Sequence, residues 1–564
     1  MKRNIIAFVL LLAVLLTITA CGTTPEVPET QAPVQVPDST KAPEPGVEAP
    51  ETPEPAVNPL PLVDEPATLT VWCPIKASAF DHIESWNENA AFIELGKRTN
   101  VVLDFTNFSS SALNTQFPIM IASGEYCDFL ANMTRYTGGL SKAIEEEVII
   151  DVYDLVIEHA PHYKEKALDA DYARRCLVTA EGYLPGFSFM SDENSMNSKF
   201  EGLIVRADWL EDLGMSYEDI VTYDDFHDML VNFKTEFGAT SPLFVNAMGI
   251  GTSNSLSAGY GITGSLNKMT MQYGFMINDE GKVDYTYLRE ECQQFLKMMN
   301  QWYNEGLLWA DFMTCDNEMI AQSAAAKSEF LDGKMGVAYG QASDIATLPE
   351  FASEEGYKLA GLAEPVLKEG DMVGGKGGPS TPTVSWAIST SCKDPVLAVR
   401  LMDYLYTDEG TLLMNFGVED LSYTMVDGAP RFTELVTNNP EGLTFDTCCN
   451  IYCVSSVPMI QLYERKTAIY SDSEDAIQAT VTWGSNLSGE NFYPNISLSA
   501  EESEIYAPLS GDINTFVSEQ VPAFIRGDLS LETDWDKFIE TLEDMKIYDC
   551  IEVKQQAYDR YIAK

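Results

Sequence analysis

The side chains best suited to chemistry in this sequence are tryptophans that stand beside polar residues. Trp483 lies in the polar, turn-rich segment Thr482–Gly489 and is the best candidate for a flat platform on which a ligand stacks. Trp72 falls at the end of a predicted strand, and Trp386 falls in another strand predicted near a cleft. For each tryptophan the alternative is a packed core position, because large apolar rings are mostly buried in folded proteins.

Four polar residues join these rings as candidate ligand-binding positions. Asn107 and Asp128 end the next two predicted strands, where an amide and a carboxylate can bond hydroxyl groups. The alternative for Asp128 is a helix cap. Arg206 and Asp208 form a charged and aromatic segment with Trp209, for which the alternative is an Arg–Asp pair beside a packed ring.

Motifs for catalysis and metal binding are missing from the sequence. It has no GxSxG, Walker A, HExxH or EF-hand pattern, and its four histidines leave little room for a histidine-based triad or a zinc site. We expect no enzyme activity, no cofactor and no metal. The 86 acidic and 35 basic residues give a formal net charge of −51, which repels nucleic acid and anionic lipid.

The first 66 residues have the composition of a leader and a tether. Residues 1–20 carry Lys-Arg and then an apolar run of secretory-signal length, which predicts a signal peptide. The run stops at Cys21, in a context similar to the bacterial lipobox, which implies a lipid on the Cys21 sulfur. Residues 21–66 are rich in proline and glutamate, which predicts a disordered and extended tether.

From residue 67 onward the sequence has the strand and helix patterns of an α/β domain. Short β-rich runs at 69–73, 101–105 and 126–130 alternate with stretches of helical spacing, which predicts βαβ units and a mainly parallel sheet. Thr222 and Asp225 are spaced as a capping box at the start of a helix. Asp394-Pro395 predicts another helix start.

Ten cysteines remain besides Cys21. Most fit the description of small buried apolar residues. Cys448, Cys449 and Cys453 are close enough in sequence for one local disulfide, and the sequence leaves both interpretations open.

Several segments together resemble the extracellular solute-binding proteins of ABC importers. The similarity is greatest to a long Gram-positive lipoprotein branch of the sugar-binding family 1-like proteins. Each segment by itself is weak, but their order and spacing along residues 67–564 make the resemblance strong. The segments are Leu203–Gly214, Asp279–Leu308, Phe330–Gly336, Trp386–Gly410 and Gln556–Tyr561.

The resemblance implies a fold and places one further residue. The expected fold is α/β and periplasmic-binding-protein-like, type II, with two discontinuous lobes, a hinge and an interlobe cleft. By analogy, residues 67–185 plus 375–418 form the first lobe, and residues 186–374 plus 419–564 form the second. Tyr423 lies in a loop that the resemblance places near the ligand.

The function implied is capture without catalysis. A monomeric, lipid-anchored protein on the outer face of the cell membrane would bind a small solute, expected to be a mono- or oligosaccharide, and deliver it to ABC permease subunits. The alternatives are a lipoprotein that binds or senses a peptide or another solute, and a tethered glycoside hydrolase. A hydrolase needs two carboxylates about 5–10 Å apart in a cleft.

Overall fold

The computed structural model describes most of the chain after the predicted tether. The described residues are 58–192, 199–245, 256–262, 274–312, 319–373, 381–454, 457–470, 472–487, 493–494 and 496–563. They belong to one compact unit, Pro55–Lys564. The predicted signal peptide, Cys21 and all but the last part of the predicted tether lie outside the described residues.

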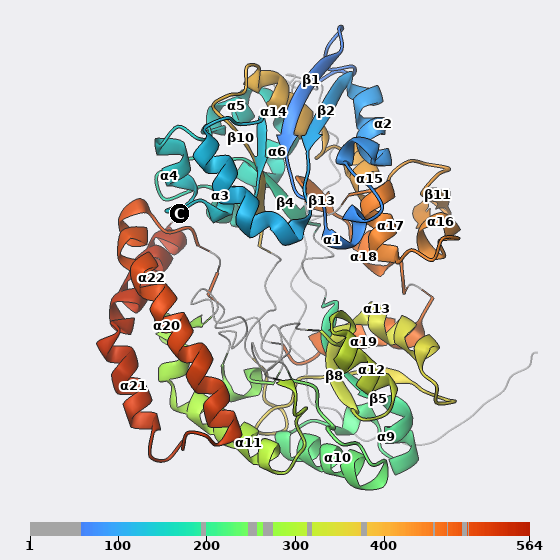
Figure 1. The fold of residues 1–564 in the computed structure, drawn as a ribbon, viewed down its shortest axis with the longest axis vertical. Coiled ribbons are helices and arrows are strands. Elements are labelled where there is room, and N and C mark those ends of the chain that lie inside the picture. Colours follow the sequence, from blue (N-terminus) through green and yellow to red (C-terminus); the bar gives the residue numbers. More distant parts are fainter. Residues whose placement is uncertain are drawn as a thin grey trace, which may run out of the picture. The chain divides into compact units, whose positions relative to one another are not determined.

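A six-stranded sheet forms the centre of the first lobe, and its order is β13-β4-β10-β3-β1-β2 (Figure 1). All its strands run parallel except β10, which is antiparallel to both neighbours. β2 alternates buried and exposed residues along its whole length, as its sequence predicts. The strands are β1 (Ala67–Trp72), β2 (Val101–Thr106), β3 (Phe129–Ala131), β4 (Phe187–Ser191), β10 (Thr383–Ile388) and β13 (Met459–Gln461).

Helices pack against this sheet and bury its apolar residues. Asn89 caps the first long helix by accepting from the backbone N–H groups of Ala91 and Phe92. Asp394 caps α14 with Pro395 in its first turn, so that predicted helix start is confirmed. The helices are α1 (Ala77–Phe80), α2 (Ala90–Thr99), α3 (Leu113–Ser123), α4 (Gly139–Glu145), α5 (Tyr153–His159), α6 (Pro161–Lys164), α7 (Asp171–Leu177), α14 (Pro395–Tyr404), α15 (Asp408–Phe416), α16 (Glu434–Thr437) and α17 (Phe445–Tyr452).

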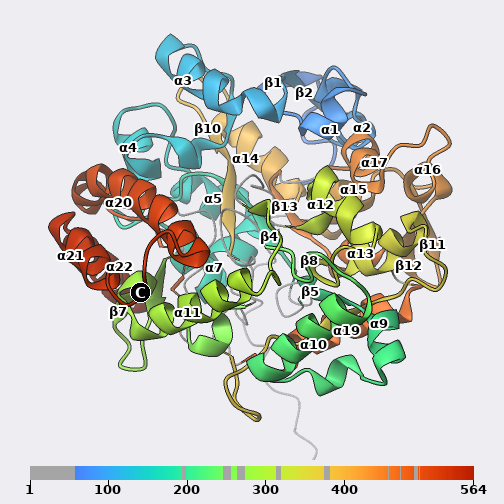
Figure 2. The same ribbon diagram turned by 60° about the horizontal axis from the view of Figure 1, so that its bottom comes forward.

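A three-stranded antiparallel sheet, ordered β8-β5-β9, forms the centre of the second lobe. Its strands are β5 (Glu201–Arg206), β8 (Val337–Gln341) and β9 (Leu359–Leu362). The helix α19 (Glu474–Gly484) lies against β5 and β9, and Figure 2 shows it beside the same sheet. This lobe has its own buried core, separate from that of the first sheet.

The remaining elements of the second lobe enclose that core. The capping box of Thr222 and Asp225 is present at the start of α10, as predicted. The helices are α9 (Ala207–Leu213), α10 (Tyr223–Glu236), α11 (Glu290–Asn304), α12 (Ala324–Leu331), α13 (Ala342–Thr347), α20 (Ala500–Arg526), α21 (Trp535–Asp544) and α22 (Ile547–Ala563). The short helix α18 (Tyr463–Thr467) lies against the first lobe instead, where Arg465 donates to the carbonyls of Met414 and Asn415. The short hairpins are β6 (Phe275–Ile277) with β7 (Val283–Tyr285) and, beside the first lobe's helices, β11 (Tyr423–Val426) with β12 (Ala429–Phe432).

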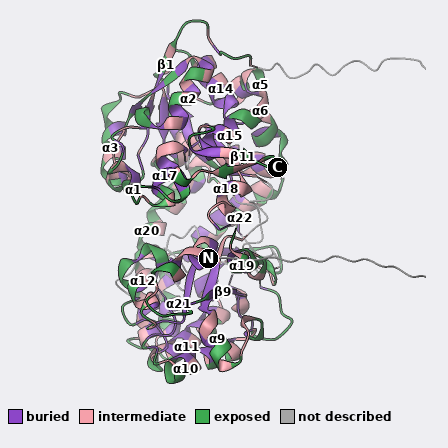
Figure 3. Cartoon of the chain, turned by 90° about the vertical axis from the view of Figure 1, so that its right-hand side faces the viewer, coloured by how far each residue is buried: buried purple, intermediate pink, exposed green. Residues whose placement is uncertain are grey.

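Strand pairing corrects the predicted lobe boundaries. β4 and β13 pair with each other inside the first sheet, although residues 186–374 and 419–564 were expected in the second lobe. The reason is that backbone N–H and C=O groups in a buried strand need ladder partners, and the first sheet supplies them. Figure 3 shows the buried residues gathered on the strands and on the helix faces turned toward them.

Candidate ligand-binding site

The parallel strands of the first sheet all end at the same edge, here named the carboxyl edge. It is defined by the last residues of β1, β2, β3, β4 and β13, which are Trp72, Thr106, Ala131, Ser191 and Gln461. The antiparallel β10 begins there. The chain connects the two sheets in three places, between β4 and β5, between β9 and β10, and between β13 and α19. These connections are named the crossings. In open α/β sheets, ligands bind beyond the carboxyl ends of the strands.

Asn107 holds together the two loops that follow β1 and β2. Its Oδ1 accepts hydrogen bonds from Ser85 Oγ at 2.8 Å and from the Trp86 backbone N–H at 2.9 Å. Its Nδ2 donates to the Cys73 carbonyl at 2.8 Å. The structure therefore places Asn107 at the carboxyl edge, as predicted, but uses its amide to position the loops on either side of it.

Aromatic rings pack at the end of β1. The Trp72 ring lies 4.7 Å from the Phe108 ring and 6.0 Å from the Phe117 ring, measured between centroids. Trp72 is 6% exposed, whereas Phe108 is only half-buried. Phe108 follows Asn107 directly, and its backbone carbonyl accepts from the Ile75 N–H. The edge thus presents a half-buried ring that is backed by a buried one.

Asp128 lies at the opposite end of its strand from the predicted position. The strand begins at Phe129, one residue after Asp128, so Asp128 precedes β3 rather than ending it. Its Oδ2 accepts from both the backbone N–H and the hydroxyl of Thr70, each at 2.7 Å. This pairing ties β1 to the start of β3. The residues that do follow β3 are Asn132, which is half-buried, and the exposed Arg135.

A cation and two rings gather where the chain crosses between the lobes. The Phe200 ring lies 5.7 Å from the Tyr463 ring, and Lys466 Nζ lies 4.5 Å from the centre of the Phe200 ring. The Tyr463 backbone N–H donates to Asp192 Oδ2 at 2.9 Å. Burial lowers the pKa of Lys466, and the nearby carboxylates of Glu201 and Asp192 oppose that shift. No sequence pattern predicts this group, because its members come from segments far apart in the chain.

A second polar group joins the crossings on the side of the second lobe. Lys199 Nζ lies 3.0 Å from Glu364 Oε1, and both side chains are largely buried. Burial raises the pKa of Glu364, and the neighbouring Lys199 counters it. Asn486 Nδ2 donates to the Glu364 carbonyl at 2.8 Å. Because Lys199 and Glu364 belong to different crossings and Asn486 follows α19, this group holds two of the crossings to the end of α19.

The carboxyl edge and the crossings offer rings, an amide and a cation to a ligand. Half-buried Phe108, Phe200 and Tyr463 provide apolar faces, and Asn132 and Lys466 provide hydrogen-bond donors. Within the described segments, no cluster of three or more histidine, cysteine, aspartate or glutamate side chains is arranged to hold a metal ion. The arrangement is suited to non-covalent binding of a polar molecule that has apolar faces.

Comparison with known proteins identifies the family. A family model described as a bacterial extracellular solute-binding protein matches residues 90–424. The chain belongs to this family. The fructooligosaccharide ABC transporter substrate-binding protein FusA of Streptococcus pneumoniae serotype 4 is 22% identical over 507 residues, which cover 85% of this chain and 88% of FusA.

Solved structures of such proteins share the fold of this solute-binding protein. An HMO-binding solute-binding protein of Bifidobacterium longum infantis superposes with a TM-score of 0.71 at 16% identity. The alginate-binding protein AlgQ2 gives 0.69 at 20% identity, and FusA of S. pneumoniae in complex with kestose gives 0.67 at 21% identity. Each comparison covers 88% of this chain and 99% of the other. The predicted periplasmic-binding-protein-like α/β fold is confirmed.

Arg206 and Asp208 of the solute-binding protein form a cluster away from the crossings. The Arg206 guanidinium is fully buried between the rings of Trp209 and Tyr357, at 4.3 and 3.9 Å, and it bonds both oxygens of Asp208. Glu354 accepts a further bond at 2.7 Å. The chain enters the second lobe at the start of β5, whereas Arg206 ends that strand. The structure therefore favours the alternative, an Arg–Asp pair beside a packed ring.

Trp386 is a core residue of the first lobe. It is 1% exposed, and its ring lies 5.7 Å from Phe129, 6.0 Å from Phe105 and 6.3 Å from Phe92. The prediction of a ligand-facing ring is corrected for this residue. Its strand, β10, runs through the middle of the sheet, so its side chains meet the covering helices.

Trp483 is also buried, which corrects the strongest prediction from the sequence. It is 1% exposed, and its Nε1 donates to the Leu203 carbonyl at 2.8 Å. A Cβ atom at Gly202 would lie 2.5 Å from the indole, and one at Gly361 would lie 3.1 Å from it. The two glycines leave room for the ring on the second sheet. Its indole is thus a packing contact between α19 and this sheet.

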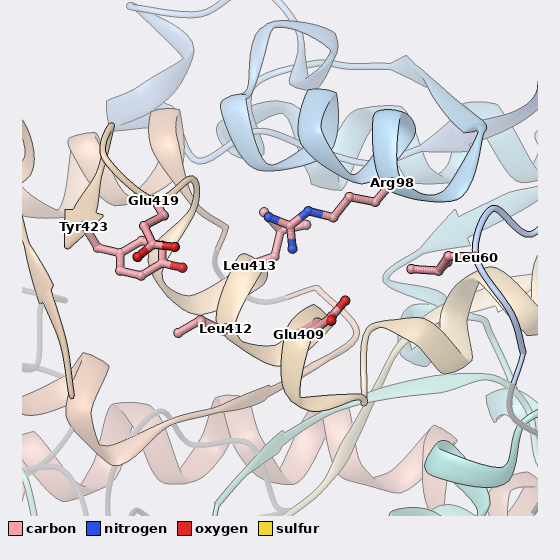
Figure 4. Close-up of a pocket in the computed structure, with 7 residues that line it drawn as sticks. All are labelled: Leu60, Arg98, Glu409, Leu412, Leu413, Glu419 and Tyr423. Atoms are coloured by element: carbon pink, nitrogen blue, oxygen red, sulfur yellow. The ribbon is translucent and has the colours of Figure 1, made fainter. Parts of the chain in front are cut away.

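Tyr423 lines a cavity of ≈ 500 Å³ beside the helices of the first lobe (Figure 4). Arg98 points into it from the last turn of α2, just before β2 begins, so the cavity lies away from the carboxyl edge. Burial and the Glu419 carboxylate raise the pKa of Tyr423, which keeps its phenol protonated. The structure does not bring Tyr423 together with Trp72 and Asn107. The lining residues are Leu60, Arg98, Glu409, Leu412, Leu413, Glu419 and Tyr423.

Proposed function

We propose that this solute-binding protein captures a neutral mono- or oligosaccharide at the carboxyl edge of its first sheet and delivers it to an ABC transporter permease. The observation that carries the proposal is the half-buried Phe108 backed by Trp72 at that edge. Sugars combine a C–H face, which packs on an aromatic ring, with hydroxyls that need hydrogen-bond partners. The relative FusA is named for fructooligosaccharides, which supports a carbohydrate ligand.

The charge of the chain favours a neutral sugar over an acidic one. The formal net charge is −51, so the overall field of the protein opposes the approach of a uronic-acid oligosaccharide. Lys466 is the cation nearest to the crossing rings, and the carboxylates of Asp192 and Glu201 lie beside it. A neutral oligosaccharide avoids both the long-range repulsion and these local charges.

We also propose that the protein holds its ligand without cleaving it and works as a monomer. The family consists of bacterial extracellular solute-binding proteins, and the relative FusA is an ABC transporter substrate-binding protein, which supports binding without cleavage. Bound sugar should therefore be recovered unchanged after long incubation. A shortened oligosaccharide would instead indicate a hydrolase.

The proposed location is the outer face of the bacterial membrane, with the lipid on Cys21 as the anchor. The family is extracellular, which supports this location. None of the helices in the described segments has the length and apolar character needed to cross a bilayer. Replacing Cys21 with serine should release the protein from membranes into the medium.

The test is a binding screen with the full chain. Kestose and a mixture of neutral milk oligosaccharides serve as neutral probes, and alginate oligosaccharides serve as the acidic comparison. Thermal unfolding and calorimetric titration measure binding. A ligand at about 100 times its Kd stabilises the folded state by about 2.7 kcal/mol. We expect one neutral class to raise the melting temperature in a saturable manner.

Two results would overturn the proposal. One is a broad panel of neutral glycans that leaves the melting temperature unchanged. The other is saturable binding of alginate oligosaccharides alone, which would contradict the preference for neutral sugars. Chromatography of the sugars after incubation tests cleavage in the same samples.

A further inference from the structure

Three buried cysteines gather at one end of α17, outside the candidate ligand-binding site. Cys448 and Cys449 lie in the helix, and Cys453 is the first residue after it. Their exposed fractions are 0%, 3% and 0%, and they pack together with Val436 in a small apolar cluster. Neither the fold nor the proposed ligand binding explains why three thiols stand together here.

Cys449 and Cys453 are placed for contact with each other. Residues four apart in a helix share a face, with Cα atoms about 6 Å apart, which is within the range that disulfides span. The Cys453 backbone leaves the helix with φ −130° and ψ −160°, so its side chain is not bound to helical geometry. Both thiols are free in the structure, and they lie close enough to shift each other's pKa. Burial and the neighbouring Cys453 raise the pKa of the Cys448 thiol, and the Asn439 side chain opposes that shift.

The surroundings make the two thiols chemically unequal. Burial raises the pKa of Cys453, but the neighbouring Cys449 thiol and the Arg465 guanidinium bring it below its ordinary value. The neighbouring Cys453 raises the pKa of Cys449, and burial adds to that shift. Arg465 is held in place because its Nη1 donates to the carbonyls of Val454 and Asn415, at 2.5 and 3.0 Å. Cys453 is therefore the better nucleophile of the pair.

We propose that Cys449 and Cys453 are a disulfide-forming pair, oxidised as the exported chain folds and before the thiols are buried, by thiol–disulfide exchange with a protein or low-molecular-weight disulfide. The Cys453 thiolate attacks that disulfide and forms a mixed disulfide, and one thiolate leaves. Cys449 loses its proton and attacks the Cys453 sulfur, and the second thiolate leaves. The pair gives up two electrons and two protons, and the external disulfide becomes two thiols. Cys448 keeps its thiol.

The pair lies where a covalent link would stiffen neighbouring structure. Asn89 Nδ2 donates to the carbonyls of Asn450 and Cys453, at 3.0 and 2.7 Å. Asn89 is also the residue that caps α2. A disulfide at the end of α17 therefore fixes the backbone atoms that hold the start of α2. This effect does not depend on the ligand or on the proposed function.

Mass spectrometry of the full chain tests the proposal. The exported protein is recovered without reductant, and free thiols are alkylated at once in denaturant; a second sample is first incubated with oxidised glutathione. Trypsin releases residues 432–465 as one peptide that contains all three cysteines. We expect this peptide to carry a single alkyl group. Its mass should be about 2 Da below that of the same singly alkylated peptide with its other two cysteines reduced, because a disulfide lacks two hydrogen atoms.

Single variants assign the bond. Cys448→Ser should keep the loss of mass, and Cys449→Ser and Cys453→Ser should each abolish it. Should either of the last two fail to fold, fragment ions of the wild-type peptide still decide, and the alkyl group should lie on Cys448. Three alkylated cysteines in the peptide after glutathione treatment would overturn the proposal. So would an alkyl group on Cys449 or Cys453 together with a disulfide to Cys448.

Discussion

The carboxyl edge of the first sheet and the helix-covered face of the second sheet both hold a tryptophan, in different settings. At the edge, Trp72 packs against Phe108, which remains half-buried. On the second sheet, Trp483 is 1% exposed, its N–H bonds to Leu203, and Gly202 makes room for its ring. An aromatic ring with every contact already made stabilises the fold, whereas a ring with a free face can still contact a ligand.

The largest expected effect is on folding stability, at the buried Trp483. Trp483→Ala should lower the free energy of unfolding by about 3–5 kcal/mol, because it leaves a cavity and removes the hydrogen bond to the Leu203 carbonyl. Urea denaturation measures this. The control is Val481→Ala in the same helix, at a residue 60% exposed, which should change stability by less than about 0.5 kcal/mol. Equal effects of the two substitutions would show that Trp483 is not packed as described.

Lys554 extends the comparison to an ionisable side chain, because it is buried inside the second lobe. It is 4% exposed, and its Nζ lies 4.6 Å from the ring centre of Tyr506 and 5.5 Å from that of Tyr493. Burial lowers its pKa to about 8, from the ordinary 10.5, although Cys550 and Glu502 oppose the shift. Between these two pH values the unfolded chain binds the proton and the folded chain does not, so the contribution of Lys554 to stability rises with pH.

The matching variant is Lys554→Met, which removes the charge and keeps the length of the side chain. The difference in unfolding free energy between the variant and the wild type should be largest below pH 8, at about 3 kcal/mol in favour of the variant, and should shrink toward pH 10.5. Burial raises the pKa of cysteines and tyrosines such as Cys292 and Tyr285, so they also make stability depend on pH in this range, but they are common to both proteins. A difference that does not change with pH would contradict the lowered pKa.

At the carboxyl edge we expect a smaller effect, on ligand binding rather than on folding. Phe108→Ala should raise the Kd for a neutral oligosaccharide about tenfold, or about 1.4 kcal/mol, because the sugar loses its apolar face contact. Calorimetric titration measures this. Ile119→Ala, on an exposed side chain of α3, is the control and should leave the Kd unchanged. If Phe108→Ala also binds normally, the ring is not part of the site.

The smallest expected effect concerns the ion pair beside the same edge. Lys76 Nζ lies 2.7 Å from Asp446 Oδ1, and about half of each side chain is exposed. Surface pairs of this kind contribute little, because water screens them and both side chains lose freedom. Lys76→Ala should therefore lower the unfolding free energy by less than about 0.5 kcal/mol in thermal or urea unfolding. A loss near that of Trp483→Ala would contradict the assignment of stability to buried packing.

Much of the fold could be predicted because its signals are local. The alternation in residues 101–106, the capping box at Thr222 and the Asp394-Pro395 helix start all depend on near neighbours in the chain. The lobe boundaries are less local. The pairing of β13 with β4 joins residues that are far apart in sequence, and no pattern within either strand predicts this pairing.

The site residues were harder to predict, because exposure depends on the whole fold. Ala476, Ala479 and Trp483 have the spacing of one helix face, which was the available sign that Trp483 is buried. The polar residues that follow Trp483 are instead typical of an exposed turn. Phe200, Tyr463 and Lys466 meet only because two crossing segments lie side by side, so their sequence positions carry no sign of the contact.

Hydrogen exchange with and without the stabilising neutral oligosaccharide tests the central claim most directly. Binding at the carboxyl edge should slow amide exchange in residues 107–112, 132–136 and 462–466, and should leave α19 unchanged. Slowed exchange confined to the cavity beside Tyr423, with no change in residues 107–112, would contradict the account.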